Sequence, residues 1–214
     1  MTEDRLARIG PLCAVLFFVL TIGGFAIGAA GGGATATLGD STAKILKAYA
    51  DPMGNGVWVG AYASTLALAP FAVFAAWLFR LRRGPLSTAG LVAAAAYISI
   101  VLAATAANFV LDYRAGHGMG SQSTLAFFYL QEALFILTWG ASAAVLALAP
   151  MSGWLRYSAR VLAALCLLAM AVPKAGWAQF PPSLFYVWTL AAGIALMMRR
   201  RAALPTTAVQ GGLA

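Results

Sequence analysis

Charge is scarce in this chain. Only 9% of its 214 residues are Asp, Glu, Lys or Arg, whereas 62% are hydrophobic. A soluble domain carries about 25% charged residues, so these few cannot cover a water-soluble globule of this size. The class that remains is a multi-pass membrane protein. One helical bundle uses nearly the whole length, and we expect residues 1–214 to form a single transmembrane domain.

Groups that bind metals or carry covalent chemistry are equally few. The chain has two cysteines, Cys13 and Cys166, each inside an apolar run, and one histidine, His117. Zinc sites need several ligands, and hydrolytic or phosphate-binding motifs need residue patterns that this sequence lacks. We therefore expect no enzyme activity, no cofactor and no metal. The net charge of +8 falls in short clusters between apolar runs, and not on one soluble face, so we expect no nucleic-acid partner.

Apolar runs long enough to cross a bilayer, about 20 residues each, occur six times. The predicted spans are Ile9–Ala30, Val57–Phe79, Leu86–Val110, Thr124–Ala149, Ser158–Trp177 and Ser183–Met198. Pro70 should kink the second span, and Pro173 should break or bend the fifth near its end. The prediction is an all-α bundle of six transmembrane helices, followed by a flexible cytoplasmic tail at residues 199–214. The first run is too long for a cleaved signal peptide, so we expect it to be retained.

The positions of arginine and lysine predict the orientation, because cytoplasmic loops are enriched in them. With the N-terminus inside, ten arginines fall in inner segments. Outer segments then hold four basic residues, which are Lys44, Lys47, Arg114 and Lys174. Both termini are therefore predicted to face the cytoplasm, with the bilayer itself as the first partner of the chain.

The longest predicted loop lies outside, between the first two spans, and contains the segment DSTAKILKAYADP. Asp40 or Ser41 can cap a helix there. Ile45, Leu46 and Tyr49 would share one face of that helix. A short amphipathic helix of this kind either lies on the outer membrane surface or packs over the mouth of the bundle, and the sequence leaves both open.

Three glycines, Gly24, Gly28 and Gly32, recur at four-residue steps in the first span. Glycines so spaced form a flat groove into which another helix can pack closely. The groove is predicted to hold a neighbouring helix of the same bundle, although it could also receive a second chain.

Polar residues inside the spans predict a candidate site. Glu132 lies in the fourth span next to Gln131, roughly 12 Å below the outer edge at 1.5 Å per residue. Neighbouring spans carry polar side chains at about this depth or nearer the outer edge. They are Thr105, Asn108 and Asp112 in the third span and Ser64 and Thr65 in the second. Intramembrane ionisable residues are candidates for function.

Glu132 has no basic partner at its depth, and burial without a cation favours the neutral form of a carboxyl group. We expect Glu132 to donate a hydrogen bond to Asn108, to Thr105 or to a second-span hydroxyl. We expect Asp112 to be a charge at the entrance, where an exposed pair with Arg114 would contribute little to stability.

Two functions from different classes fit these residues. In the first, the polar site around Glu132 opens outward and binds or transports a proton, a cation or a small solute. In the second, the chain is a non-transporting scaffold or accessory subunit. It would bind a membrane-protein partner or another copy of itself through the glycine groove and the loop helix, and the polar residues would only join helices.

The arrangement of segments resembles a known group of proteins. The arginine-flanked entry RLARIGPL (Arg5–Leu12) is followed by a long outer loop with a short helix and by the arginine turn RLRRGPLS (Arg80–Ser87). This layout resembles a broad group of bacterial six-helix integral membrane proteins classed as domains of unknown function. The resemblance covers most of the chain and implies a fold in a bacterial plasma membrane. It implies no activity and no functional residue.

Overall fold

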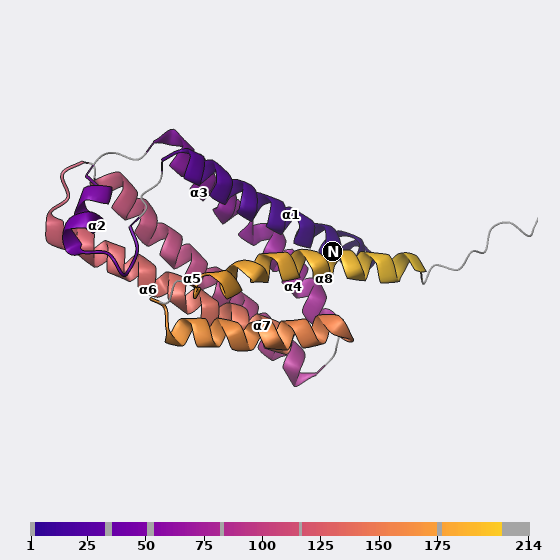
Figure 1. Ribbon diagram of the computed structural model, residues 1–214. Coiled ribbons are helices and arrows are strands. Elements are labelled where there is room, and N and C mark those ends of the chain that lie inside the picture. Colours follow the sequence, from indigo (N-terminus) through magenta and orange to yellow (C-terminus); the bar gives the residue numbers. More distant parts are fainter. Residues whose placement is uncertain are drawn as a thin grey trace, which may run out of the picture.

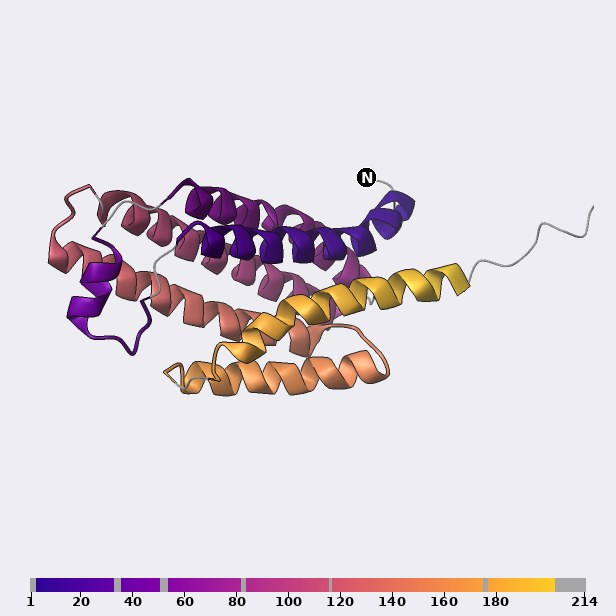
Figure 2. The same ribbon diagram turned by 45° about the horizontal axis from the view of Figure 1, so that its top comes forward.

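The computed structural model describes residues 3–32, 36–50, 54–81, 84–115, 117–174 and 177–202, and the regular elements within them are all α-helices. The helices are α1 (Glu3–Ala30), α2 (Thr42–Ala48), α3 (Asn55–Leu66), α4 (Leu68–Arg80), α5 (Pro85–Ala115), α6 (Ser121–Leu148), α7 (Trp154–Ala171) and α8 (Phe180–Ala202). They form an elongated bundle with α2 at one end (Figures 1 and 2). We call that end the outer end, following the predicted orientation.

Six stretches of the described chain are long and apolar enough to cross a membrane. They are Ile9–Ala30, Asn55–Arg80, Pro85–Arg114, Ser121–Leu148, Trp154–Ala171 and Phe180–Met198. The predicted all-α bundle with six membrane-spanning helices is thereby confirmed.

Both predicted ends of the fifth span and the predicted start of the tail were wrong. The fifth span begins at Trp154 and ends at Ala171, not at Trp177. Pro173 disfavours helical backbone in the residue before it, and the helix stops two residues before this proline. The last helix continues through Ala202, so the first part of the predicted tail is helical. Residues 203–214 of that tail lie outside the described residues.

Pro70 acts on the second span as its chemistry requires. The ring has no N–H to donate to the carbonyl of Leu66 and crowds the preceding turn. The span accordingly consists of two helices, with α3 ending at Leu66 and α4 beginning at Leu68. Ala67 joins them with nearly helical angles (φ −59°, ψ −24°), so the span bends without reversing.

An aromatic cluster fills the centre of the bundle. Phe71 of α4 is fully buried. Its ring centroid lies 4.8 Å from that of Phe17 of α1, 5.0 Å from Tyr97 of α5 and 5.9 Å from Phe185 of α8. Four helices therefore meet at one layer of rings, which separates the outer half of the bundle from the inner half.

Glycine lets α1 and α3 cross with their backbones in contact. A Cβ atom on Gly60 would lie 2.6 Å from the Gly28 nitrogen and closer still to the Gly24 carbonyl oxygen. Near the end of α1, Gly31 and Gly56 approach each other in the same way. The predicted groove thus receives α3 of the same chain.

Gly32 does not belong to this contact, contrary to the prediction. It lies just beyond α1 with φ +77°, and nothing surrounds the place of its missing Cβ atom. The four-residue step fails there because the backbone leaves the helical conformation at Gly32, whereas the Gly31 N–H still donates to the Ile27 carbonyl. Gly31, seven residues after Gly24, is the glycine that stays on the contacting face.

The loop helix α2 packs over the bundle, and does not lie flat on a surface. The Ser41 hydroxyl caps its first turn by accepting a hydrogen bond from the Lys44 N–H. Ile45 and Tyr49 are 0% and 5% exposed and form an apolar cluster with Leu111 and Phe128 of the α5–α6 hairpin. The sequence left two alternatives open, a helix on the membrane surface and a helix packed over the mouth of the bundle. The contacts of α2 agree with the second.

Replacing Ile45 with aspartate should release α2 from the hairpin while the six spans stay folded. The new carboxylate would be buried among apolar side chains without a partner, which costs several kcal/mol. Trypsin should then cut the purified protein after Lys44 or Lys47 on the order of tenfold faster, because cleavage follows local opening.

Ala43→Asp is the matched control for this prediction, since Ala43 is exposed on the same helix and an acidic residue is favourable in a first turn. Equal cleavage of the two variants would contradict the packing of α2.

Candidate functional site: a cavity in the outer half of the bundle

The outer half of the bundle contains two helix pairs, α1 with α3 and α5 with α6. The pairs meet where Trp58 and Tyr62 of α3 pack on Phe109 of α5, with ring centroids 5.4 and 5.5 Å apart. Among the described residues, the backbone of α1 does not approach that of α5 or α6. A cavity of about 540 Å³ lies between the pairs. Its deep end is formed by Phe17, Leu68, Tyr97 and Tyr186, at the aromatic layer.

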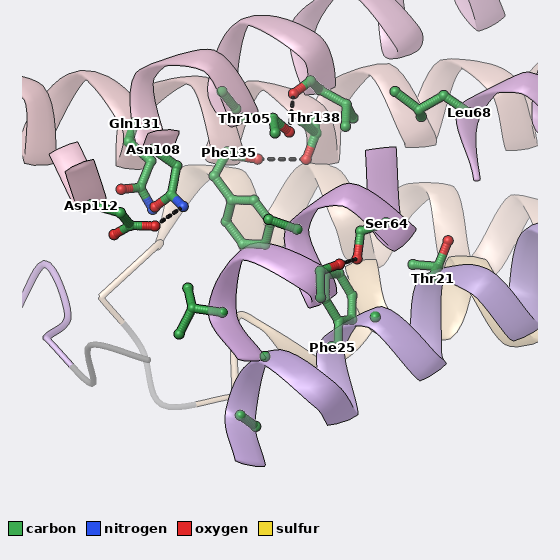
Figure 3. A pocket seen from close by; sticks show the side chains of 18 of the residues that line it. Thr21, Phe25, Ser64, Leu68, Thr105, Asn108, Asp112, Gln131, Phe135 and Thr138 are labelled. Atoms are coloured by element: carbon green, nitrogen blue, oxygen red, sulfur yellow. Dashed lines mark hydrogen bonds between the residues drawn. The ribbon is translucent and has the colours of Figure 1, made fainter. Parts of the chain in front are cut away.

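Most of the residues predicted for the site line this one cavity. They are Glu132, Gln131, Asn108, Thr105, Asp112 and Ser64. Figure 3 shows Gln131, Asn108 and Asp112 converging near one end, from α6 and α5, while Ser64 and Thr21 lie on α3 and α1. Thr65 does not line the cavity. Its neighbour Ser64 does, and one helical step turns a side chain by about 100°.

Asp112 is paired inside the cavity wall and is not the exposed entrance charge that the sequence suggested. Its side chain is buried, with 5% of the residue exposed. Its Oδ2 accepts a hydrogen bond of 2.6 Å from Asn108 Nδ2, one helical turn earlier. Within the described residues Asp112 makes no ion pair with Arg114, because Asn108 holds the carboxyl group on the inner face of α5.

Glu132 makes no hydrogen bond within the described part of the chain, so the predicted bonds to Asn108, Thr105 and the α3 hydroxyls were wrong. Each proposed partner is occupied on its own helix. Thr105 donates to the Val101 carbonyl at 2.8 Å, and Ser64 donates to that of Gly60 at 3.0 Å. Hydroxyls in helices often bond to a carbonyl of the preceding turn in this way. Glu132 is left half-buried, facing the cavity without a protein partner.

Tyr49 of the outer loop lines the same cavity as the carboxyl groups of Asp112 and Glu132. Burial raises the pKa of the Tyr49 hydroxyl well above its usual range, and the charges of Asp112 and Glu132 raise it further. Only charges that lie near a group affect it in this way. The hydroxyl therefore stays protonated at neutral pH and is an O–H donor beside the acidic groups.

Sequence reasoning missed several polar groups of the cavity. Thr21 of α1 is 4% exposed and lines it, and its Oγ1 atom has no hydrogen-bond partner among the described residues. The Gln131 Oε1 atom is also buried and unpartnered. Thr21 could have been found, since it precedes Gly24 by three residues and Gly28 by seven and so shares their face. Tyr49 could not, because no periodicity links a loop residue to the spans.

The charges lining the cavity are of one sign. Asp112 and Glu132 are acidic, and none of the described lining residues is Lys, Arg or His. The described part of the chain also holds no group of three His, Cys, Asp or Glu side chains able to bind a metal. The cavity offers two carboxyl groups, amide and hydroxyl groups, and aromatic faces.

Comparisons with known proteins do not extend this description: no family model matches the sequence, and no curated protein or solved structure matches the chain. The resemblance to bacterial six-helix membrane proteins stays a prediction based on layout.

Proposed function

We propose that this chain is a multi-pass protein of a bacterial plasma membrane that takes a small solute into the outer cavity around Glu132 and transports it. The observation that supports this most directly is the cavity itself. Its volume lies in the range of about 300–1,000 Å³ that is typical of small-molecule sites. The Glu132 carboxyl group faces it and makes no hydrogen bond within the described residues, and an ionisable group inside a membrane is costly and is a candidate for function.

The two surfaces that the scaffold hypothesis requires for partner binding are covered by other parts of the same chain. The glycine face of α1 is covered by α3 through Gly60, and the apolar face of α2 is covered by Leu111 and Phe128. Neither surface is free for a partner, and this favours the solute-binding function.

Entry of a solute into the cavity is tested by labelling a cysteine placed inside it. Cys13 and Cys166 are buried and are first replaced by alanine. In that background the thiol of Thr105→Cys should react with a membrane-impermeant maleimide added from the outer side. Thr105 lines the cavity, so reagent that enters the cavity would reach this thiol. We expect the rate to exceed that of Ser142→Cys by at least about tenfold, since an enclosed thiol reacts only after local opening.

Ser142→Cys is a matched control, because Ser142 is 3% exposed and lies in the packed part of α6. Equal labelling of the two positions, or none at Thr105→Cys, would refute an outward-facing cavity.

Transport is tested separately, with the purified protein reconstituted in proteoliposomes. If the reconstituted protein moves neither protons nor monovalent cations under an imposed gradient, transport of these ions and of solutes coupled to them is excluded.

A further inference from the structure

The cavity is too large for the smallest solutes considered above. At about 540 Å³ it has room for an organic molecule, whereas a proton or an inorganic cation would be bound by a few ligands at close range. The described residues also provide no group of side chains for a metal ion. The volume therefore points to an organic solute.

The charges of the lining set the charge of that solute. Two carboxyl groups face the space with no basic side chain among the described lining residues. An anion would meet repulsion there in surroundings of low dielectric constant, where charge interactions are strong. A cation would supply the partner that Glu132 lacks, and its N–H groups or polarised C–H groups could reach the unpartnered oxygen atoms of Thr21 and Gln131.

The remaining lining consists mainly of small or aliphatic residues and of aromatic side chains. The aromatic side chains include Phe17, Phe25, Tyr49, Tyr97, Phe135 and Tyr186. The faces of such rings attract cations, with the largest effect where water is excluded. Aromatic walls also bind the apolar part of a solute.

One edge of the cavity suits a solute with an apolar part. In the described chain the backbones of α1 and α6 do not approach each other, and the cavity lies between them. Phe25 of α1 and Phe135 of α6 line it and are 48% and 38% exposed. An amphipathic molecule that has partitioned into the outer leaflet would meet these two rings before it met the carboxyl groups.

We infer that the solute is an amphipathic organic cation, with its charged group held between Asp112 and Glu132 and its apolar part against the aromatic rings. This inference rests on the proposed function. It further assigns the chemical class of the solute.

The test uses three probes of similar shape and different charge: the cation tetraphenylphosphonium, the anion tetraphenylborate and neutral triphenylphosphine oxide. Each is added to the Thr105→Cys protein before the maleimide. We expect tetraphenylphosphonium to slow labelling in a saturable way, at concentrations at least about tenfold lower than either other probe.

Removing the two charges should abolish this preference. Asp112→Asn combined with Glu132→Gln keeps an oxygen atom for the bond from Asn108 and leaves the shape unchanged. The concentration of tetraphenylphosphonium needed for protection should rise at least about tenfold in this variant. An unchanged labelling rate without probe shows that its cavity is intact. Asp40→Asn is the control, because Asp40 pairs with Lys44 at 2.7 Å outside the cavity.

The outcomes separate this inference from the proposed function. If all three probes protect equally, or if the double variant behaves like the wild type, the cation assignment is wrong and the solute cavity stands. If no probe protects a thiol that is labelled, the assignment is likewise wrong. If Thr105→Cys is not labelled in any condition, the assignment and the outward-facing cavity fail together.

Discussion

Replacing Gly60 with alanine should destabilise the folded bundle by about 2 kcal/mol or more. The new methyl group would meet only backbone atoms, with Gly28 nitrogen at 2.6 Å and Gly28 Cα at 2.8 Å, and with the Gly24 carbonyl even nearer. Backbone of a helix cannot turn aside as a flexible side chain can. α1 and α3 would have to separate, and the close contact along the whole glycine face would be lost.

Unfolding of the purified protein by sodium dodecyl sulfate in mixed micelles measures this effect. Gly23→Ala is the matched control, since a Cβ atom at Gly23 would meet nothing within 4 Å. It should be neutral or should stabilise α1 by up to about 1 kcal/mol, because alanine favours helix over glycine. If Gly60→Ala unfolded at the same detergent fraction as Gly23→Ala, the backbone contact between α1 and α3 would be wrong.

Replacing Phe71 with alanine should cost about 3 kcal/mol of stability. The range for buried phenylalanine in soluble proteins is about 3–5 kcal/mol. We expect the lower end, because packing and not the exclusion of water drives helix association in lipid. Phe71 is fully buried and contacts rings from three other helices. Its removal would leave a void behind the deep end of the cavity.

A second effect of Phe71→Ala should follow from that void. The aromatic layer divides the outer cavity from the inner half of the bundle, so an opening in it should let protons cross. A pH-sensitive dye inside proteoliposomes should report faster leakage than with the wild type. Phe180→Ala is the control, since Phe180 is 72% exposed. Unchanged stability and leakage in Phe71→Ala would show that the layer does not close the cavity.

Much of the architecture could be predicted because a bilayer imposes simple rules on sequence. A span needs an apolar run of fixed length, and depth can be counted at a constant rise per residue. The count placed Thr105 and Glu132 at similar depths, and both line the cavity. The break at Pro70 followed from the missing N–H group.

The hydrogen bonds of the site could not be predicted by the same counting. Depth shows which residues are level, but it does not show which partner is nearer. Asn108 donates a hydrogen bond to Asp112, one turn away on the same helix, and Thr105 donates one to the Val101 carbonyl. Both local partners were available before any other helix packed against α5. Glu132 had no such neighbour, and within the described residues its carboxyl group makes no hydrogen bond, like the Thr21 hydroxyl and the Gln131 amide oxygen.

The interruption at Ala67 gives the second span a mechanical property. A continuous helix resists bending along its length, whereas a turn that lacks one N–H···O bond is compliant. This compliant point adjoins Leu68, which lies at the deep end of the cavity. It joins two helices that both pack against α1, but through different kinds of contact. On the outer side, α3 is held against α1 by the glycine contact at Gly60. On the inner side, Phe71 of α4 is packed among the aromatic rings. Any change in the width of the cavity would therefore be concentrated at a single joint, and the aromatic layer would be spared.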